Sequence, residues 1–158
     1  MRMNLRNLLN RLIREGKLKR EEVDISYIQS LLDAAKRNFE AASLVEGKID
    51  EAAFKLFYDG LLQVGRVILI LNGYRPDDGE QHKTTFAVAG EFLGNEYTRL
   101  IRKIQKYRVK RNYAIYDPKI IVSRKETEAI HRTAQEFWQV VRSYLSDKDP
   151  QLKLFKEI

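Results

Sequence analysis

Apolar residues recur every three or four positions along most of this chain, which is the spacing of amphipathic helices. The pattern predicts six helices, over residues 4–15, 26–46, 50–71, 82–92, 96–116 and 124–145. The third is apolar nearly all round from Leu61 onward, so we expect it to lie at the centre, with Gly60 and Gly65 allowing neighbours to approach closely. Its VILIL run would also suit a buried strand, but the unbroken helical pattern before it favours a helix.

Residues that start or stop helices separate these segments. The predicted stops are Gly16, Gly47, the Asn72-Gly73 pair, Gly94 and the Asp117-Pro118 pair. Asp50 is the expected N-cap of the third helix, and Ser123 with Glu126 forms a capping-box pattern before the last. Residues 17–22 and 74–81 have the composition of a charged link and a loop.

The expected fold class is therefore all-α, with residues 1–158 forming one domain. A charged tail over residues 146–158 is expected to be loosely held. No apolar run approaches the length of a membrane span, and Arg and Asn interrupt the N-terminus too often for a signal peptide, so we expect no membrane partner and a cytoplasmic location. With no cysteine and two distant histidines, no metal site and no cofactor are predicted.

The positive charge of the chain comes from one segment. There are 29 Lys and Arg residues against 22 Asp and Glu, a net charge of +7. Between Tyr97 and Tyr116 seven residues are basic and none is acidic, so the rest of the chain is balanced. A local excess of this kind indicates a polyanionic partner.

Within helix 96–116 the basic residues fall on two faces. The face opposite the apolar stripe has the composition of an ordinary solvated helix and carries Arg99, Arg102, Lys103, Lys106 and Lys110. Arg108 and Arg111 instead fall inside the stripe, beyond Ile104. Because an unpaired guanidinium in a dry core is very costly, either acidic partners meet these arginines, or the helix end opens into a cleft or subunit interface that receives an anion.

The sequence KRNYAIYD brings further polar groups to the same helix end. Arg108, Asn112 and Tyr116 follow one another at helical spacing on one side. A guanidinium, a carboxamide and a phenol together suit phosphate and ribose. They would also suit a structural cluster of salt bridges and hydrogen bonds, and the pattern alone does not separate the two.

Three features resemble the HEPN family (higher eukaryotes and prokaryotes nucleotide-binding) over about residues 26–145. They are a long central helix followed by a loop and His82, a later helix ending in Arg111-Asn112, and a closing helix. The resemblance implies a four-helix up-and-down bundle core with additional short helices. It also implies a homodimer with two motifs facing one cleft, and metal-independent RNA cleavage in which the ribose 2′-hydroxyl attacks the adjacent phosphate.

Carried over to this sequence, Arg111 would stabilise the charge that develops on phosphorus and Asn112 would orient the RNA. Flanking phosphates would contact the other basic residues of the helix, which are Arg102, Lys103, Lys106, Arg108 and Lys110. In the family signature a histidine follows the Arg-polar pair after a few residues, and Tyr116 takes its place here. A phenol, with an ordinary pKa near 10, is a poor base at pH 7, so Tyr116 is expected to donate a proton or a hydrogen bond.

The two histidines are expected to have structural roles. His82 opens a helix, where capping or packing is the expected role, and His131 is expected to be a surface or packing residue. The alternative for His131 is that the closing helix brings it near Arg111 and restores an imidazole there.

Two function classes are consistent with these patterns. The first is a protein that binds RNA or a nucleotide, with ribonuclease activity that is weakened or lost, in a toxin–antitoxin or defence pair with a small nucleotidyltransferase; the pairing is by analogy with the family. The second is a helical interaction module that uses its basic helix to hold an acidic protein partner or a nucleotidyltransferase, with no nucleic-acid role.

Overall fold

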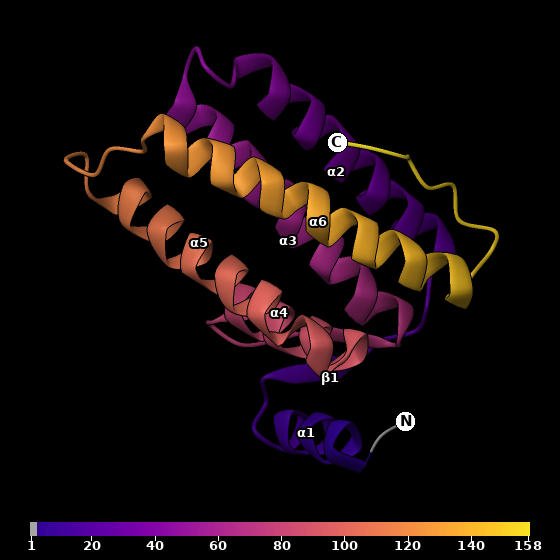
Figure 1. The fold of residues 1–158 in the computed structure, drawn as a ribbon. Helices are drawn as coiled ribbons and strands as arrows, with labels where there is room; N and C mark the ends of the chain where they lie inside the picture. The colour runs from indigo at the N-terminus through magenta and orange to yellow at the C-terminus, as the bar shows by residue number, and fades with distance from the viewer. Residues whose placement is uncertain (1–2) are drawn as a thin grey trace.

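Four long helices of alternating direction form the body of the protein in the computed structural model, which describes residues 3–158 (Figure 1). The helices are α1 (Met3–Arg14), α2 (Ile25–Val45), α3 (Asp50–Leu71), α4 (Gln81–Leu93), α5 (Thr98–Tyr116) and α6 (Arg124–Lys148). A single 3₁₀ turn, Asn95–Tyr97, leads into α5. The prediction of an all-α fold is confirmed, and its long helices are α2, α3, α5 and α6.

Helix α3 is the centre of the molecule, since it contacts α2, α4, α5 and α6. Its two glycines allow this. A Cβ atom at Gly60 would clash with the ring of Phe39 from α2. At Gly65 a Cβ atom would lie 3.3 Å from the ring of Phe86 in α4. The close approach predicted at both glycines is therefore observed, and it lets two neighbouring helices pack directly on the α3 backbone.

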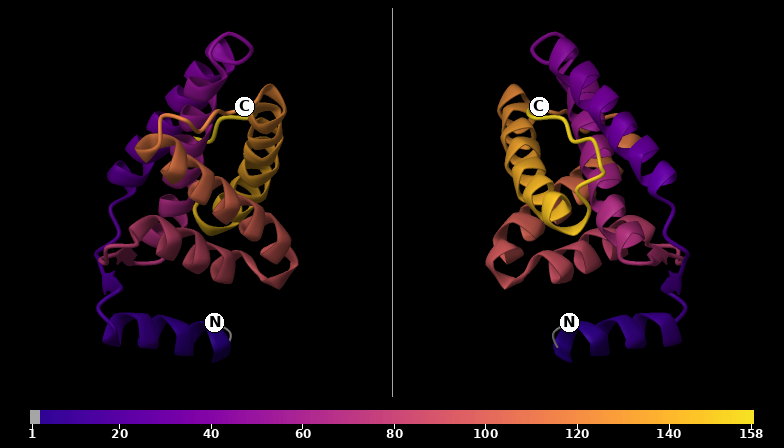
Figure 2. Two further views of the ribbon diagram at one scale, coloured as in Figure 1. Left: turned by 90° about the vertical axis from the view of Figure 1, so that its left-hand side faces the viewer. Right: turned by 90° about the vertical axis from the view of Figure 1, so that its right-hand side faces the viewer.

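A small antiparallel sheet was not predicted. Strand β1 (Leu18–Arg20) pairs with β2 (Tyr74–Pro76), in the segments expected to be a link and a loop. Leu18 and Tyr74 are buried there, but three-residue strands are too short to show an alternating pattern. The sheet joins the N-terminal region to the end of α3, and α1 lies beyond it at one end of the molecule (Figure 2).

The predicted N-terminal cap is confirmed for α6, but the residue predicted to cap α3 is wrong. Ser123 and Glu126 form the predicted capping box, with Ser123 Oγ accepting from the Glu126 N–H at 3.1 Å and Glu126 Oε1 from the Ser123 N–H at 3.0 Å. Asp50, however, is the first residue of α3 and not its N-cap, which is Ile49. The Asp50 carboxylate instead accepts from the Gly47 N–H at 2.9 Å, so it closes the α2–α3 turn.

The C-terminal tail is well held, contrary to expectation. After α6 the chain turns back and runs beside α6 and α2 (Figures 1 and 2). The ring of Phe155 stacks on Trp138, with centroids 3.9 Å apart and planes 6° apart, and Trp138 Nε1 donates to the Phe155 carbonyl at 2.9 Å. Gln29 of α2 makes two hydrogen bonds to the Lys153 backbone. Such side-chain bonds to backbone leave no periodic signal in a sequence.

Over residues 3–158, none of the helices combines the length and the apolar character needed to cross a bilayer.

Candidate functional site

A cleft of about 580 Å³ lies between the end of α5 and the loop that enters α4. Its α5 wall contains four residues predicted from the sequence, which are Arg108, Arg111, Asn112 and Tyr116. Its other wall is the segment from Asp78 to Lys83. The two arginines inside the apolar stripe of α5 therefore open into a cleft, and the structure brings the predicted polar group together there.

Arg111 has only weak acidic compensation. Its Nη2 lies 3.7 Å from Oδ1 of Asp59 in α3, and its guanidinium lies over the Tyr58 ring, 5.4 Å from the centroid. Burial raises the pKa of Asp59 even though Arg111 acts to lower it, so the pair is loose. The Nε atom of Arg111 is buried and has no hydrogen-bond partner. A buried donor without a partner is costly, so the guanidinium of Arg111 is only partly compensated by its protein neighbours.

Arg108 has a neutral partner. Its Nε donates to Oε1 of Gln105 at 2.7 Å, and among residues 3–158 no acidic side chain forms an ion pair with it. The cleft lining contains three cations (Lys83, Arg108 and Arg111) and two carboxylates (Asp78 and Glu80). The Nζ atom of Lys83 lies 3.8 Å from Oε2 of Glu80, so Arg108 and Arg111 are the cations of the lining that an anion would meet.

His82 also lies in this cleft, in the first turn of α4. Its Nδ1 is 3.0 Å from the hydroxyl of Tyr58 in α3. Burial lowers the pKa of His82, and Arg111, Arg66 and Arg108 lower it further because a second positive charge nearby is unfavourable. The sequence favoured capping or packing for His82 and did not place it beside the arginines. The only sequence signal was its position directly after the loop that follows the central helix.

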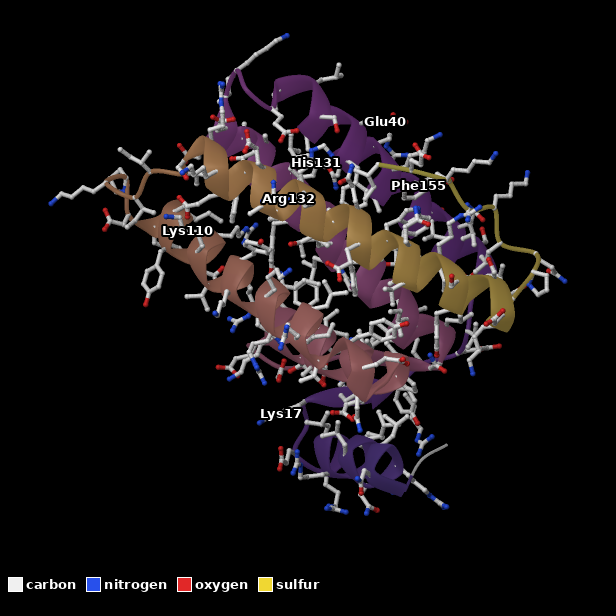
Figure 3. All side chains as sticks on the ribbon, in the orientation of Figure 1. Lys17, Glu40, Lys110, His131, Arg132 and Phe155 are labelled. Carbon is white, nitrogen blue, oxygen red and sulfur yellow. The ribbon has the colours of Figure 1, made fainter. Side chains whose placement is uncertain are left out.

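His131 does not bring a second imidazole to the cleft. His131 lies on α6 (Figure 3). Its Nδ1 is 2.7 Å from Oε2 of Glu46, and its ring stacks on Phe57 with centroids 4.5 Å apart. It is absent from the residues that line the cleft. Tyr116, in contrast, lines the cleft with 85 % of its surface exposed, so its phenol stands at the rim.

The remaining basic residues of α5 lie outside the cleft. The Nζ atom of Lys110 is 3.2 Å from Glu126 Oε2 and 3.2 Å from the Ile121 carbonyl, so Lys110 links α5 to the start of α6. Lys103 lines a separate hollow beside Tyr107 and Glu136. Arg102 and Lys106 are exposed. Of the predicted phosphate-binding set, only Arg108 therefore lines the cleft, where it lies with Arg111, and the other four residues lie outside it.

A larger hollow, of about 840 Å³, lies between β1 and α2 and differs in chemistry. Glu21, Glu22 and Asp24 line it, and no cation or histidine does. Its carboxylates would repel an anion such as a phosphate. Across residues 3–158, no three His, Asp or Glu side chains gather as metal ligands would.

Comparison of the chain with models of protein families, with curated proteins and with solved structures gives no match. The fold and the cleft alone therefore define the class of the protein. It is an all-α protein with a cationic cleft between α5 and the start of α4.

Proposed function

We propose that this chain is a HEPN-like RNA-binding protein whose cleft receives one phosphodiester of RNA and promotes its cleavage without a metal ion. The observation that carries the proposal is that Arg108 and Arg111 open into one cleft with incomplete acidic compensation. The Arg111-Asn112 pair on which the HEPN resemblance rests lies in this cleft, within an all-α fold.

The groups in the cleft suit the parts of a nucleotide. Guanidinium groups bind phosphate through paired N–H donors, and they stay charged at every physiological pH. Asn112 offers a donor and an acceptor to a ribose hydroxyl, and the exposed ring of Tyr116 offers a surface on which a base can stack. Arg102 and Lys106 lie exposed on the same helix, where flanking phosphates would pass.

We further propose that two copies associate through the end of α5. Val109, Tyr113 and Tyr116 follow one another at helical spacing, and they are 41 %, 63 % and 85 % exposed. Ile121, in the loop that follows, is 78 % exposed. An apolar stripe of this kind beside a cleft supports a protein interface, and a second copy would bring a second cleft next to the first.

The test of RNA binding is the affinity for a single-stranded RNA oligonucleotide in excess chelator, measured by fluorescence anisotropy for wild type, Arg111→Ala and Arg37→Ala. Arg37 is an exposed arginine of α2 outside the cleft, so it controls for the lost charge. Loss of a charge-assisted hydrogen bond predicts binding about tenfold weaker in Arg111→Ala. The slope of log affinity against log salt should also fall by about 0.7.

Equal affinities of Arg111→Ala and Arg37→Ala would refute the proposed site. If wild type does not bind RNA but forms a stable stoichiometric complex with an acidic protein, the interaction-module alternative is supported instead. The salt series separates the two arginine variants even when general electrostatic attraction contributes, because only a residue that touches phosphate changes the slope.

A further inference from the structure

We propose that His82 is the general base of this site, oriented by Tyr58, and that it takes over the proton transfer for which Tyr116 is unsuited. The inference rests on the RNA-binding function proposed above and names the group that acts on the bound phosphodiester. It assigns chemistry to a residue from α4, a different helix from the one that carries the arginines.

The placement of His82 follows from the packing of α4. This short helix contacts both α3 and α5. In its first turn the Lys83 carbonyl accepts from Gln105 Nε2 of α5 at 3.0 Å, one helical turn before Arg108. His82 lines the same cleft as both arginines, and electrostatic effects from both act on its ring. A base for the 2′-hydroxyl must lie close to the groups that hold the adjacent phosphate, and His82 meets this condition.

Tyr58 holds the ring and leaves one nitrogen available. The Tyr58 hydroxyl is the hydrogen-bond partner of Nδ1, and among the described residues Nε2 has no partner and is not a buried atom. Burial raises the pKa of Tyr58, so the phenol stays neutral throughout the physiological range. When Nδ1–H donates to the Tyr58 oxygen, the lone pair of Nε2 is free to accept a proton.

The charges around His82 favour the neutral ring that a base requires. Burial away from water is the largest cause of the lowered pKa of His82, and the nearby arginines are the next. The titratable and charged groups that contact or surround the ring, or line its cleft, come from four segments and are Tyr58, Arg66, Asp78, Glu80, Lys83, Arg108, Arg111 and Tyr116. When an RNA phosphate enters, its negative charge offsets the arginines, so the ring can then hold the proton that it accepts.

The reaction balances with solvent water alone. The proton of the ribose 2′-hydroxyl passes to Nε2 of His82 while O2′ forms a bond to phosphorus. The P–O5′ bond breaks, and O5′ leaves with the electron pair and takes a proton from solvent water. His82 returns its proton to the solvent, and the products carry a 2′,3′-cyclic phosphate and a 5′-hydroxyl. Arg111 and Arg108 stabilise the charge that builds on the phosphoryl oxygens.

The experiment compares cleavage of a single-stranded RNA oligonucleotide in excess chelator by wild type, His82→Gln and His131→Gln, with products identified by mass spectrometry. His131 is the matched control, since it is the other histidine and lies outside the cleft. We expect wild type to release cyclic phosphate ends, and His131→Gln to do so too. Removal of a general base predicts a rate about 100-fold or more lower in His82→Gln, with RNA affinity little changed.

Two further readouts separate catalysis from a structural role. At RNA concentrations well below saturation, the wild-type rate should rise with pH across the range in which His82 of the free protein loses its proton, below the ordinary histidine value of 6.5, and His82→Gln should lack this rise. Free imidazole should restore cleavage by His82→Ala, because it supplies the missing base, whereas a merely structural defect would not respond. Circular dichroism and unfolding curves confirm that the variants are folded.

Each failure has its own signature. If His82→Gln cleaves within a few-fold of wild type while Arg111→Ala is inactive, the assignment of His82 is wrong and the proposed site stands. If wild type binds RNA through Arg111 but leaves it intact, the inference falls and an RNA-binding function remains. If wild type neither binds nor cleaves RNA, both proposals fail together.

Discussion

At the scale of single residues, the chemistry of this protein depends on how incompletely Arg111 is neutralised. Asp59 is its one acidic neighbour among the described residues, at 3.7 Å. Burial raises the pKa of this carboxyl group despite the nearby guanidinium, so the ion pair does not offset the desolvation of Asp59. Arg111 therefore has charge available for a ligand, and Asp59 competes with that ligand.

Asp59→Asn should accordingly strengthen RNA binding. The substitution removes a negative charge beside the phosphate site and keeps the size of the side chain. A half-exposed ion pair contributes roughly 0.2–1 kcal/mol, which corresponds to an affinity gain of up to about fivefold. Titration of labelled RNA at low salt measures the change. Asp33→Asn, in an exposed position on α2, is the control, and an unchanged or weaker affinity in Asp59→Asn would show that Asp59 does not compete with the ligand.

His82 should make the stability of the fold depend on pH. Its pKa is lower in the folded state than the ordinary 6.5, so below that pH the unfolded chain takes up a proton before the folded chain does. The contribution of His82 to the free energy of unfolding must then fall as pH drops below about 6.5 and be constant above it. Urea unfolding from pH 5 to 8 should show this loss in wild type and a smaller loss in His82→Gln. Parallel curves for the two proteins would show that His82 keeps its ordinary affinity for protons on folding.

At the scale of elements, the sequence predicted the features that repeat along a single helix. It missed the features that depend on the angle at which two helices cross. The helix stripes, the capping box at Ser123 and the close approach at Gly60 are local patterns, and the structure confirms them. The cleft wall formed by α4 depends on the angle at which a short helix meets α3 and α5. No local pattern encodes that angle, so the sequence brought Arg108 and Arg111 together but not His82.

Gly60→Ala tests whether the α2–α3 packing is as tight as the structure shows. Alanine favours helix by about 1 kcal/mol relative to glycine, but its Cβ would clash with the ring of Phe39, which is nearly fully buried. Overpacking in a core costs about 1–3 kcal/mol, so we expect a net loss of stability in urea unfolding. Gly79→Ala, where a Cβ atom would meet nothing within 4 Å, is the control. A stabilised Gly60→Ala variant would mean that Phe39 moves aside without cost.

At the scale of the whole molecule, contacts between residues far apart in the sequence hold the N-terminal region and the C-terminal tail in place. The sheet joins residues near positions 18 and 75, and the tail returns to place Phe155 on Trp138. Neither is visible in the sequence, because one depends on two very short strands and the other on a single aromatic pair. The tail packs on α6 and α2, which leaves the exposed stripe of Val109, Tyr113 and Tyr116 as an apolar surface beside the cleft.

Tyr113→Glu should therefore weaken dimerisation without destabilising the folded protomer. A charge placed in an apolar interface loses the buried contact and remains desolvated, which predicts dimerisation weakened at least about tenfold. The unfolding free energy of the protomer should hardly change, because Tyr113 is 63 % exposed. Sedimentation velocity over a concentration series measures the association, with Tyr27→Glu on α2 as the control.

If wild type stays monomeric throughout, or if Tyr27→Glu weakens association equally, the end of α5 is not the interface. If Tyr113→Glu is monomeric and still cleaves RNA at the wild-type rate, one cleft is sufficient for the chemistry; a loss of cleavage that follows the loss of dimer would show that the two clefts act together.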